Sequence, residues 1–478
     1  MKILLLLIFS HNIIYDEMLE IQKLYIHNNK NIDVYFITLN ETQSEEVILN
    51  NNIISINGKE SYTNILFKTL KSLKFINNLN SQYDFVVRSN VSTIINLNNL
   101  YEYLKQLPKI NVYTGAKVET LQWLLQPHEI CDTKRDQSAY FGLKYIQGIG
   151  IILSYDIVQS ILSFEHTIEY DIVDDVKLGL IIRDFFPEAY KNIDKLELPS
   201  LSYNYFKPES VFIRNKNVNR IDDIYNMYNI IDNFSDIKYQ NFDKIIHISY
   251  KNIDHLENVK SEWLQLNPNY IVELYNDERC ITFLNTYFGK KYGDIFNYIK
   301  DGPIKCDFFR LCVLFIFGGI YVDADIKPLI PLDEYIDDDV DLATCVSYNY
   351  KQHKNSFQFN PHFIVSKKYN NFIYDSIKKY ECYYDNQITY SYWGWSICTM
   401  FKIETRFDLS DQKNIFNFII NNKKYQFITE SVIIQEDKII NFKNYDELNE
   451  DRDSISCICC MYGDRIVINN FTNKQFLK

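Results

Sequence analysis

Short apolar runs alternate with longer amphipathic stretches from the start of the chain. Ile3–Phe9 is a continuous apolar run, typical of a parallel strand buried on both faces, and Val34–Leu39 is a second one. Between Tyr62 and Ile76 apolar residues recur at helical spacing, and Asp84–Val87 returns to the pattern of a strand. This alternation predicts an α/β fold, a mostly parallel sheet with helices on both faces.

The alternation starts again in the second half of the chain. The pattern weakens between residues 208 and 242, where Asn is frequent, and Lys244–Ile248 then has the composition of a new first strand. We therefore expect two α/β domains of similar length, residues 1–238 and 239–478. The length of 478 residues allows this, since one domain per ~150 residues gives about three at most.

Charge and cysteine content exclude some classes of function. Lys and Arg number 50 and Asp and Glu 62, so the net charge is −12, which disfavours binding of nucleic acid through an overall field. Of the 10 cysteines, Cys457, Cys459 and Cys460 form one tight cluster without the second pair of a structural zinc site, so buried thiols in a reducing compartment are favoured. No stretch reaches the ~20 apolar residues of a membrane span, and we expect a soluble, cytoplasmic protein.

The strongest candidate chemistry follows a helix that ends in two glycines. Asp307–Phe317 has apolar residues on one face, and Gly318 and Gly319 end it because glycine accepts the left-handed conformation. A short apolar strand follows, and Asp323 and Asp325 stand at its carboxyl end, where period-two alternation puts both carboxylates on one face. Ligands of open α/β sheets bind beyond this end, and two carboxylates there suit Mg²⁺ or Mn²⁺ that bridges to a substrate diphosphate.

The same helix carries an acid and a base on one face. Asp307 and Arg310 are three residues apart, where an arginine can fork to phosphate or sugar oxygens and an aspartate can accept hydrogen bonds from hydroxyls. A bare Asp-x-Asp is a weak signal, and solvated loop carboxylates are the alternative interpretation of Asp323 and Asp325.

Taken together, Asp-x-x-Arg, the helix, Gly-Gly, the strand and Asp-x-Asp closely resemble the DXD sugar transferase family. That family includes the initiating α-1,6-mannosyltransferases, the α-1,4-galactosyltransferases and, more distantly, the glucosylating clostridial toxins. Three further segments match the opening of the family in order and spacing: Lys244–His247, Trp263–Tyr270 and Glu273–Asp277. The resemblance covers roughly residues 243 to 335.

This resemblance implies a GT-A fold that passes a glycosyl group from a UDP- or GDP-sugar to a glycan or glycoprotein acceptor. Asp323 and Asp325 would hold Mn²⁺ or Mg²⁺ and the donor diphosphate. Asp307 and Arg310 would contact the donor sugar, and Tyr321 would line the nucleotide pocket. The donor-site residues are therefore expected to be Asp307, Arg310, Gly318, Gly319 and Tyr321. Members of this family retain the anomeric configuration, and no protein nucleophile is assignable.

Two later segments fall where the family has acceptor-side and metal-side elements. Asn360-Pro361-His362 is the first, and a hydrogen-bonded structural role for His362 is favoured over that of a base. Trp393-Gly394-Trp395-Ser396 is the second, and it departs from the usual Thr-Gly-Pro of the family. Core packing is the simpler interpretation of Trp393 and Trp395, and an aromatic wall against a sugar ring is the functional one.

The first half carries three motifs of its own, Tyr62–Thr69, Tyr145–Ser154 and Asp174–Gly179. They resemble the Tyr-x-Asn-Leu-x-x-Lys-Thr helix, the glycine-containing acceptor strand and the acidic catalytic segment of the fringe and β-1,3-galactosyltransferase family, over about residues 60 to 185. In that segment the second acid is the general base, so Asp175 would deprotonate the acceptor hydroxyl of an inverting transfer. Acids that cap the amino end of a helix are an equally good interpretation.

The first half also lacks part of the family pattern. Where the family has Asp-Asp-Asp after its strand, this chain reads Val86–Ser92, without carboxylates and with Arg88. One hypothesis is metal-independent chemistry in which Arg88 supplies the positive charge at the donor. The other is a degenerate domain that binds acceptor or shapes the enzyme.

We expect a bifunctional glycosyltransferase that adds two successive sugars to a glycan. The alternatives are a single-activity transferase whose first domain binds acceptor, and a non-catalytic glycan-binding scaffold. Relatives of both halves usually carry a membrane anchor and this chain has none, which suits a cytosolic pathway of a microbe or a virus that builds its own glycans.

Overall fold

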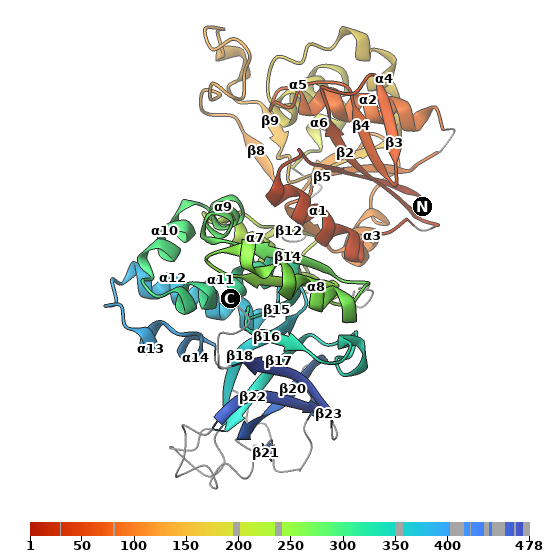
Figure 1. Ribbon diagram of the computed structural model, residues 1–478. Helices are drawn as coiled ribbons and strands as arrows, with labels where there is room; N and C mark the ends of the chain where they lie inside the picture. The colour runs from red at the N-terminus through yellow and green to blue at the C-terminus, as the bar shows by residue number, and fades with distance from the viewer. Residues whose placement is uncertain are drawn as a thin grey trace. The chain divides into compact units, whose positions relative to one another are not determined.

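The chain divides into two compact units, Met1–Lys238 and Tyr239–Lys478 (Figure 1). The computed structural model describes residues 1–28, 30–79, 82–194, 201–234, 241–348, 357–401, 415–420, 422–434, 439–441, 455–462 and 465–471. Within these residues, no helix is both long and apolar enough to cross a membrane.

The first unit is built on a seven-stranded sheet of order β3-β4-β2-β1-β5-β10-β7. β1 (Ile3–Ile8) lies parallel to β2 (Ile32–Leu39) on one side and to β5 (Phe85–Asn90) on the other, and all six of its residues are buried. β10 (Gly150–Ser154) runs antiparallel to β5. The other strands of this unit are β3 (Val47–Asn50), β4 (Ile53–Ile56), β6 (Thr93–Ile95), β7 (Tyr113–Gly115), β8 (Val118–Thr120), β9 (Lys144–Ile146), β11 (Leu201–Tyr203) and β12 (Phe212–Arg214).

Helices cover both faces of this sheet. Leu4, Leu6 and Ile8 of β1 share one core cluster with apolar side chains of α2, α4 and α5, and Figure 1 shows α1 on the opposite face. The helices of this unit are α1 (Ile13–Tyr25), α2 (Ile65–Asn77), α3 (Leu97–Leu104), α4 (Tyr155–Ser163), α5 (Asp174–Phe185), α6 (Pro187–Lys191) and α7 (Arg220–Ile231), with short 3₁₀ turns at Ser138–Tyr140 and Glu165–Thr167.

The second unit has an eleven-stranded sheet whose first part repeats the arrangement of the first unit. β13 (Ile245–Ser249) lies parallel to β14 (Ile271–Tyr275) and to β15 (Gly319–Val322), and β18 (Phe357–Ser366) is antiparallel to β15. In each unit the first strand is therefore central, flanked by the second and third parallel strands, with an antiparallel strand next. The remaining strands are β16 (Ile326–Pro328), β17 (Leu342–Tyr348), β19 (Ile415–Ile420), β20 (Lys423–Ile434), β21 (Ile439–Asn441), β22 (Ile455–Tyr462) and β23 (Arg465–Phe471).

The helix before the two glycines is the most buried helix of the second unit. α11 (Gly302–Phe317) is buried without interruption from Asp307 to Ile316, and it starts earlier than the sequence predicts because Pro303 suits its first turn. Gly319 has φ +87°, and a Cβ there would lie 2.5 Å from the Ile245 carbonyl oxygen of β13. A side chain at this position would therefore push β13 and β15 apart. The other helices are α8 (Glu257–Leu266), α9 (Asp277–Tyr287), α10 (Lys290–Tyr298), α12 (Asn371–Asp385), α13 (Tyr392–Trp395) and α14 (Ile397–Met400), with 3₁₀ turns at Ile253–Leu256 and Leu332–Glu334.

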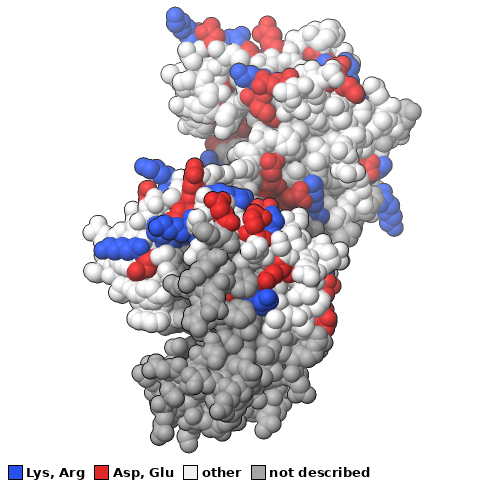
Figure 2. All heavy atoms as spheres, viewed as in Figure 1, with Lys and Arg blue, Asp and Glu red and all other residues white. Residues whose placement is uncertain are grey.

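The predicted α/β class is confirmed in both units, with parallel strands at the centre of each sheet and antiparallel strands beside them. On the face that Figure 2 shows, basic and acidic side chains of the described residues are interspersed without a large field of one sign. The cysteines whose side chains are described are all free thiols; Cys280, Cys312 and Cys345 are buried, while Cys131, Cys382 and Cys398 are exposed. The side chains of the cluster Cys457, Cys459 and Cys460 lie outside the described part.

Candidate active sites

The two aspartates of the Asp-x-Asp motif lie in a turn that leaves the carboxyl end of β15. The backbone N–H of Ile326 donates to the Asp323 carbonyl oxygen at 3.0 Å and closes this turn. Ala324 is packed in the core of the unit, while Asp323 and Asp325 stay partly exposed. From the sequence, the shared direction of the two carboxylates was attributed to the alternation of side chains along a strand, and this reason was wrong. β15 ends at Val322, before the motif. The conformation of the turn directs Ala324 into the core and leaves both aspartates partly exposed to solvent.

Arg310 joins the helix motif to the carboxylate turn. Its Nη2 lies 3.0 Å from Asp307 Oδ1 and 2.9 Å from Asp323 Oδ1, and its side chain is only 4% exposed. Its guanidinium carbon lies 4.6 Å from the ring centroid of Tyr321, a cation–π contact. The sequence predicted Asp307 and Arg310 on one face of α11 and Asp323 after β15. In the structure the guanidinium of Arg310 contacts both aspartates.

Tyr321 reaches the site from inside the sheet. Its side chain is completely buried, and its hydroxyl lies 2.5 Å from Ser249 Oγ at the end of β13. Contact of Tyr321 with a nucleotide stays a prediction. In this structure its contact with the site runs through Arg310.

Asp307 is also fixed from the carboxyl side of the chain. Its Oδ2 accepts a hydrogen bond of 3.0 Å from the backbone N–H of Ile397, the first residue of α14. Burial raises the pKa of Asp307, while Arg310 and the Ile397 N–H lower it. The segment around the two tryptophans is thereby tied to an acid of the candidate donor site.

Asp323 and Asp325 fit a divalent cation that shares its coordination with a substrate. Burial, and to a smaller extent the nearby charge of Asp325, raise the pKa of Asp323 to about 6, although Arg310 opposes this rise. A bound cation would relieve this repulsion, and both ligands are hard carboxylate oxygens. In the described residues no three His, Cys, Asp or Glu side chains converge as a metal site. The set therefore suits Mg²⁺ or Mn²⁺, which is held by two carboxylates and completed by waters and a diphosphate.

The two tryptophans have different environments. Trp395 is completely buried and packs against rings that include Tyr298 at 5.3 Å and Tyr383 at 5.8 Å between centroids. Trp393 is 73% exposed and touches the ring of Tyr392 edge-on at 5.1 Å. Core packing thus describes Trp395 and fails for Trp393.

His362 lies beside the carboxylate turn. It is buried, and its carbonyl oxygen accepts a hydrogen bond of 2.9 Å from the backbone N–H of Asp323. Its imidazole lowers the pKa of Asp323. The side chains of Asn360 and Pro361 lie outside the described part.

In the first unit, Arg88 and the paired acids meet at one loop. Arg88 Nη2 lies 2.5 Å from Asp174 Oδ2, and its Nη1 donates to the Gly148 carbonyl at 2.6 Å. The Gly148 N–H donates to Asp175 Oδ2 at 3.1 Å. A Cβ at Gly148 would lie 2.6 Å from Arg88 Nη1, so only glycine leaves room for this guanidinium.

The glycine-containing strand predicted over Tyr145–Ser154 is two strands with a break between them. β9 ends at Ile146 and pairs with β8, whereas β10 starts at Gly150 and belongs to the main sheet. Gly148 lies in this break, where its carbonyl accepts from Arg88 and its amide donates to Asp175.

Asp175 has the protonation behaviour of a candidate base. Burial and the charge of Asp174 raise its pKa to about 7, although the Gly148 N–H and Arg88 oppose this rise. A carboxyl group that titrates near neutral pH is well matched to proton transfer. Asp174 and Asp175 also occupy the first turn of α5, whose N-cap is Val173, so the alternative of acids at a helix dipole stays open.

A buried lysine lies at the same end of this sheet, and although it belongs to the Tyr62–Thr69 motif, no role was predicted for it from the sequence. Lys68 of α2 is completely buried, and its Nζ donates to the Phe9 carbonyl at 2.8 Å and to Glu60 Oε1 at 2.7 Å. Glu60 also accepts the Leu39 N–H at 2.8 Å. The Lys68–Glu60 ion pair is therefore hydrogen-bonded to the backbone at the carboxyl ends of β1 and β2. Its signal in the sequence is the lysine of the Tyr-x-Asn-Leu-x-x-Lys-Thr motif, since α2 also carries Lys71 and Lys74 and a lysine in this helix is not distinctive by itself.

Two family models match the chain, one in each unit. Residues 35–187 match the galactosyltransferase model, and residues 254–341 match the model of the glycosyltransferase sugar-binding region containing the DXD motif. These matches confirm the resemblance of the first half to galactosyltransferases and of the second half to DXD sugar transferases. The second match contains Asp307, Arg310, Asp323 and Asp325.

Individual relatives cover short parts of the chain. The initiation-specific alpha-1,6-mannosyltransferase of Candida albicans is 30% identical over 76 residues, which are 16% of this chain and 20% of that protein. This chain therefore spans about a fifth of the length of that relative. Among solved structures, the glycosyltransferase GlyE of Streptococcus pneumoniae has a TM-score of 0.25 and 10% identity, over 60% of this chain and 79% of that one. The PaToxG glycosyltransferase has a TM-score of 0.24 and 16% identity, over 34% and 66% of the two chains.

Proposed function

We propose that this chain, whose two halves match two glycosyltransferase family models, is a bifunctional glycosyltransferase that moves sugars from nucleotide-sugar donors to a glycan acceptor. The observation that carries the proposal is Arg310, which holds Asp307 and Asp323 together at the carboxyl end of β15, where α/β sheets bind their ligands. A cytoplasmic location in a microbial or viral pathway stays a prediction.

The second unit would use a donor held by a metal. Asp323 and Asp325 would hold Mn²⁺ or Mg²⁺, which when bound neutralises charge on the leaving diphosphate. Arg310 keeps Asp323 in place, and Asp307 would accept hydrogen bonds from hydroxyls of the donor sugar. Transfer with retention is the outcome that the family resemblance implies.

The first unit would transfer by inversion. The acceptor oxygen bonds to the anomeric carbon while the bond from that carbon to the diphosphate breaks, and its electron pair leaves with the diphosphate. Asp175 takes the proton of the acceptor hydroxyl, for which the raised pKa suits it. The alternative, a first unit that only binds acceptor, is favoured by one observation. The charge of Arg88 is already balanced by Asp174, so Arg88 is not free to neutralise a donor.

A donor screen on the full chain tests this function. UDP- and GDP-sugars are incubated with the protein in Mn²⁺ or in EDTA, and release of the nucleoside diphosphate is measured with and without glycan acceptors. We expect release from at least one donor in Mn²⁺ and its loss in EDTA for the second unit. Absence of both nucleotide release and nucleotide binding across the screen would leave the glycan-binding scaffold as the function.

Trp393 is expected to bind a sugar ring of the acceptor. It is exposed, and its neighbour Tyr392 is close enough to Asp307 that the charge of this acid raises the Tyr392 pKa, after burial. Trp393→Ala should raise the KM for acceptor about tenfold with kcat nearly unchanged, because tenfold corresponds to about 1.4 kcal/mol, the order of burying one aromatic face.

Two other tryptophans provide the controls for this variant. Trp123→Ala removes a tryptophan that is 46% exposed in the first unit and should leave the KM of the second unit unchanged. Trp395→Ala empties a buried site and should lower the free energy of unfolding by about 3–5 kcal/mol. An acceptor KM of Trp393→Ala equal to that of the unmodified chain would argue against the sugar contact.

A further inference from the structure

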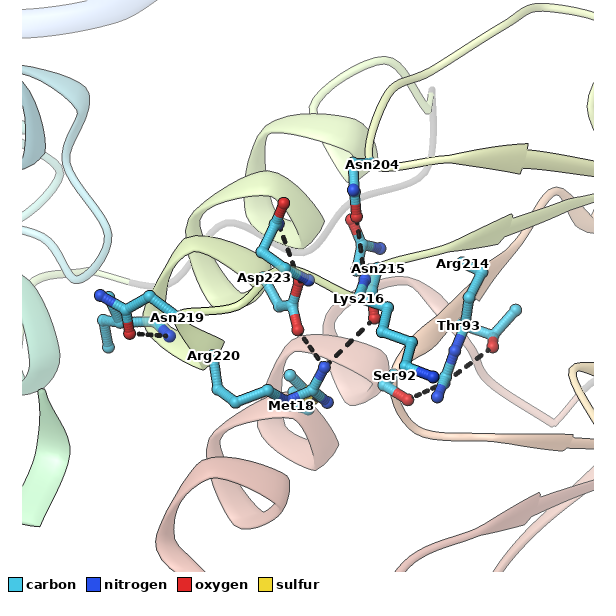
Figure 3. Close-up of polar contacts among 12 residues, drawn as sticks. Met18, Ser92, Thr93, Asn204, Arg214, Asn215, Lys216, Asn219, Arg220 and Asp223 are labelled. Carbon is cyan, nitrogen blue, oxygen red and sulfur yellow. Dashed lines mark hydrogen bonds and ion pairs between the residues drawn. The ribbon is translucent and has the colours of Figure 1, made fainter. Parts of the chain in front are cut away.

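One arginine of the first unit, Arg214, forms no ion pair with any acid among the residues that the structure describes. Arg214, the last residue of β12, donates from Nη1 to Asn90 Oδ1 at 3.2 Å, to Thr93 Oγ1 at 3.5 Å and to Ser92 Oγ (Figure 3). Each of the other arginines whose side chains the structure describes forms an ion pair with a carboxylate: Arg88, Arg135, Arg183, Arg220, Arg279 and Arg310. All described bonds of Arg214 use one nitrogen, so its other N–H groups are left for a ligand.

The residues that hold Arg214 lie at the carboxyl end of β5 and just beyond it, and the Asp-x-Asp motif directly follows β15. In the first unit, Ile8 at the end of β1 is the parallel partner of Asn90. In the second unit, His247 is the parallel partner of Tyr321, and the same register places Ser249, the end of β13, level with Asp323. On this side of the strand, Asn90 is therefore the counterpart of Asp323.

The antiparallel neighbours give the same correspondence. Ser89 is the last residue of β5 that pairs with β10, and Val322 is the last residue of β15 that pairs with β18. The next residues are Asn90 in one unit and Asp323 in the other. Asn90-Val91-Ser92 thus stands in the place of Asp323-Ala324-Asp325, and Arg214 lies against the two polar positions of that tripeptide.

The charges around Arg214 leave it without a counter-ion. Burial lowers its pKa, and the positive charges of Arg220 and Arg88 lower it further, against Tyr15 and Asp223. Arg220 is itself paired with Asp223 in the first turn of α7, and Figure 3 shows these two side chains side by side. Arg88 is paired with Asp174. The unbalanced positive charge at this end of the sheet is therefore on Arg214, and an anion would stabilise it.

We propose that Arg214 is the anion-binding group of the first unit and takes the diphosphate of a nucleotide-sugar donor in the place where the second unit uses a divalent cation. The inference rests on the proposed transferase function for the choice of a nucleoside diphosphate. A guanidinium fixed by Asn90, Ser92 and Thr93 presents two or more N–H groups to phosphate oxygens without any metal. The first unit then binds its donor in EDTA, while the second does not.

The test measures binding of UDP and GDP by calorimetry in EDTA. The full chain carries Asp323→Asn and Asp325→Asn, so that the metal-dependent site of the second unit is disabled. We expect UDP or GDP to bind, and Arg214→Gln to raise its Kd about 10- to 100-fold, the range for loss of charge-assisted hydrogen bonds. Uridine and guanosine, which lack phosphate, should bind this variant and its parent equally.

Two further variants keep the result interpretable. Lys216→Gln removes the same charge from an exposed position two residues away and should leave the Kd unchanged. Arg214→Lys keeps the positive charge but lacks the planar guanidinium that donates paired hydrogen bonds, so its Kd should lie between those of the parent and Arg214→Gln. If Arg214→Gln does not fold, as judged by thermal unfolding, Arg214→Lys decides the matter.

Three results would overturn the inference: no binding of UDP or GDP in EDTA, binding that requires Mn²⁺, or a Kd that Arg214→Gln leaves unchanged. Failure of the proposed function has a different signature. If UDP or GDP binds through Arg214 but no sugar is transferred in EDTA, the anion site stands and the first unit is not a transferase. Transfer in EDTA at an unchanged rate by Arg214→Gln would keep the transferase and remove Arg214 from it.

Discussion

Asp325→Asn should abolish Mn²⁺-dependent transfer by the second unit, with kcat lowered by at least about 10³-fold, the equivalent of several kcal/mol of metal stabilisation. The variant loses one of two carboxylates and keeps the ion pairs of Arg310 with Asp307 and Asp323. Its thermal unfolding should therefore match that of the unmodified chain. Transfer is measured as product formation from the donor identified in the screen.

Asp323→Asn should lose the same activity and some stability as well. Its carboxylate is one of two that balance the buried Arg310, and weakening a buried ion pair is costly. Asp338→Asn serves as the control, because it removes an aspartate whose side chain is 56% exposed and should leave both properties unchanged. Full Mn²⁺-dependent transfer by the Asp323→Asn/Asp325→Asn chain would exclude the donor site proposed for this unit.

Asp175→Asn should abolish transfer by the first unit in EDTA, by about 10²- to 10⁴-fold in kcat, the usual range for loss of a general base. The unmodified chain should show kcat/KM in EDTA that rises with pH and levels off above about 7, because only the deprotonated carboxylate accepts a proton. Asp184→Asn, in the same helix and 49% exposed, is the matched control.

Stability separates this role of Asp175 from a structural one. Between the ordinary carboxyl pKa of 3.8 and about 7 the folded protein binds a proton that the unfolded chain has released, so the free energy of unfolding falls as pH rises through that window. Above pH 7 the buried carboxylate is charged and costs stability, which asparagine does not. Asp175→Asn should thus be at least as stable as the unmodified chain at pH 8, as measured by denaturant unfolding. An inactive variant that is also less stable at pH 8 would favour a capping role.

The central parallel strands of both sheets, and the site residues within single local motifs, could be predicted because their signals are local. Arg310 and Asp307 follow from helical spacing. Gly318 ends α11 as predicted, but with φ +62° and ψ −156°, a conformation open to glycine that is not the left-handed helical one predicted for it. The environments of Trp393 and Trp395 could not be predicted from the sequence, because both residues lie in one short helix. They differ in their tertiary neighbours, since the rings of Tyr298 and Tyr390 pack against Trp395. Burial of that kind depends on tertiary packing.

Long-range contacts account for the rest. Arg214 reaches Asn90 across 124 residues, and no spacing near either residue marks the other. In one of the two hypotheses for the first half, Arg88 supplies the positive charge at a donor. The structure pairs Arg88 with Asp174, a residue 86 positions away in numbering that only the fold brings near.

The hydrogen bond from the Ile397 amide to Asp307 has a kinetic consequence. Asp307 divides its two oxygens between Arg310 and the segment that carries Trp393, so a donor hydroxyl that bonds to Asp307 competes with that segment for the same carboxylate. Occupancy of the donor site and the position of Trp393 are then coupled. If the donor sugar bonds to Asp307 as proposed, we expect the acceptor KM to depend on which donor sugar is present.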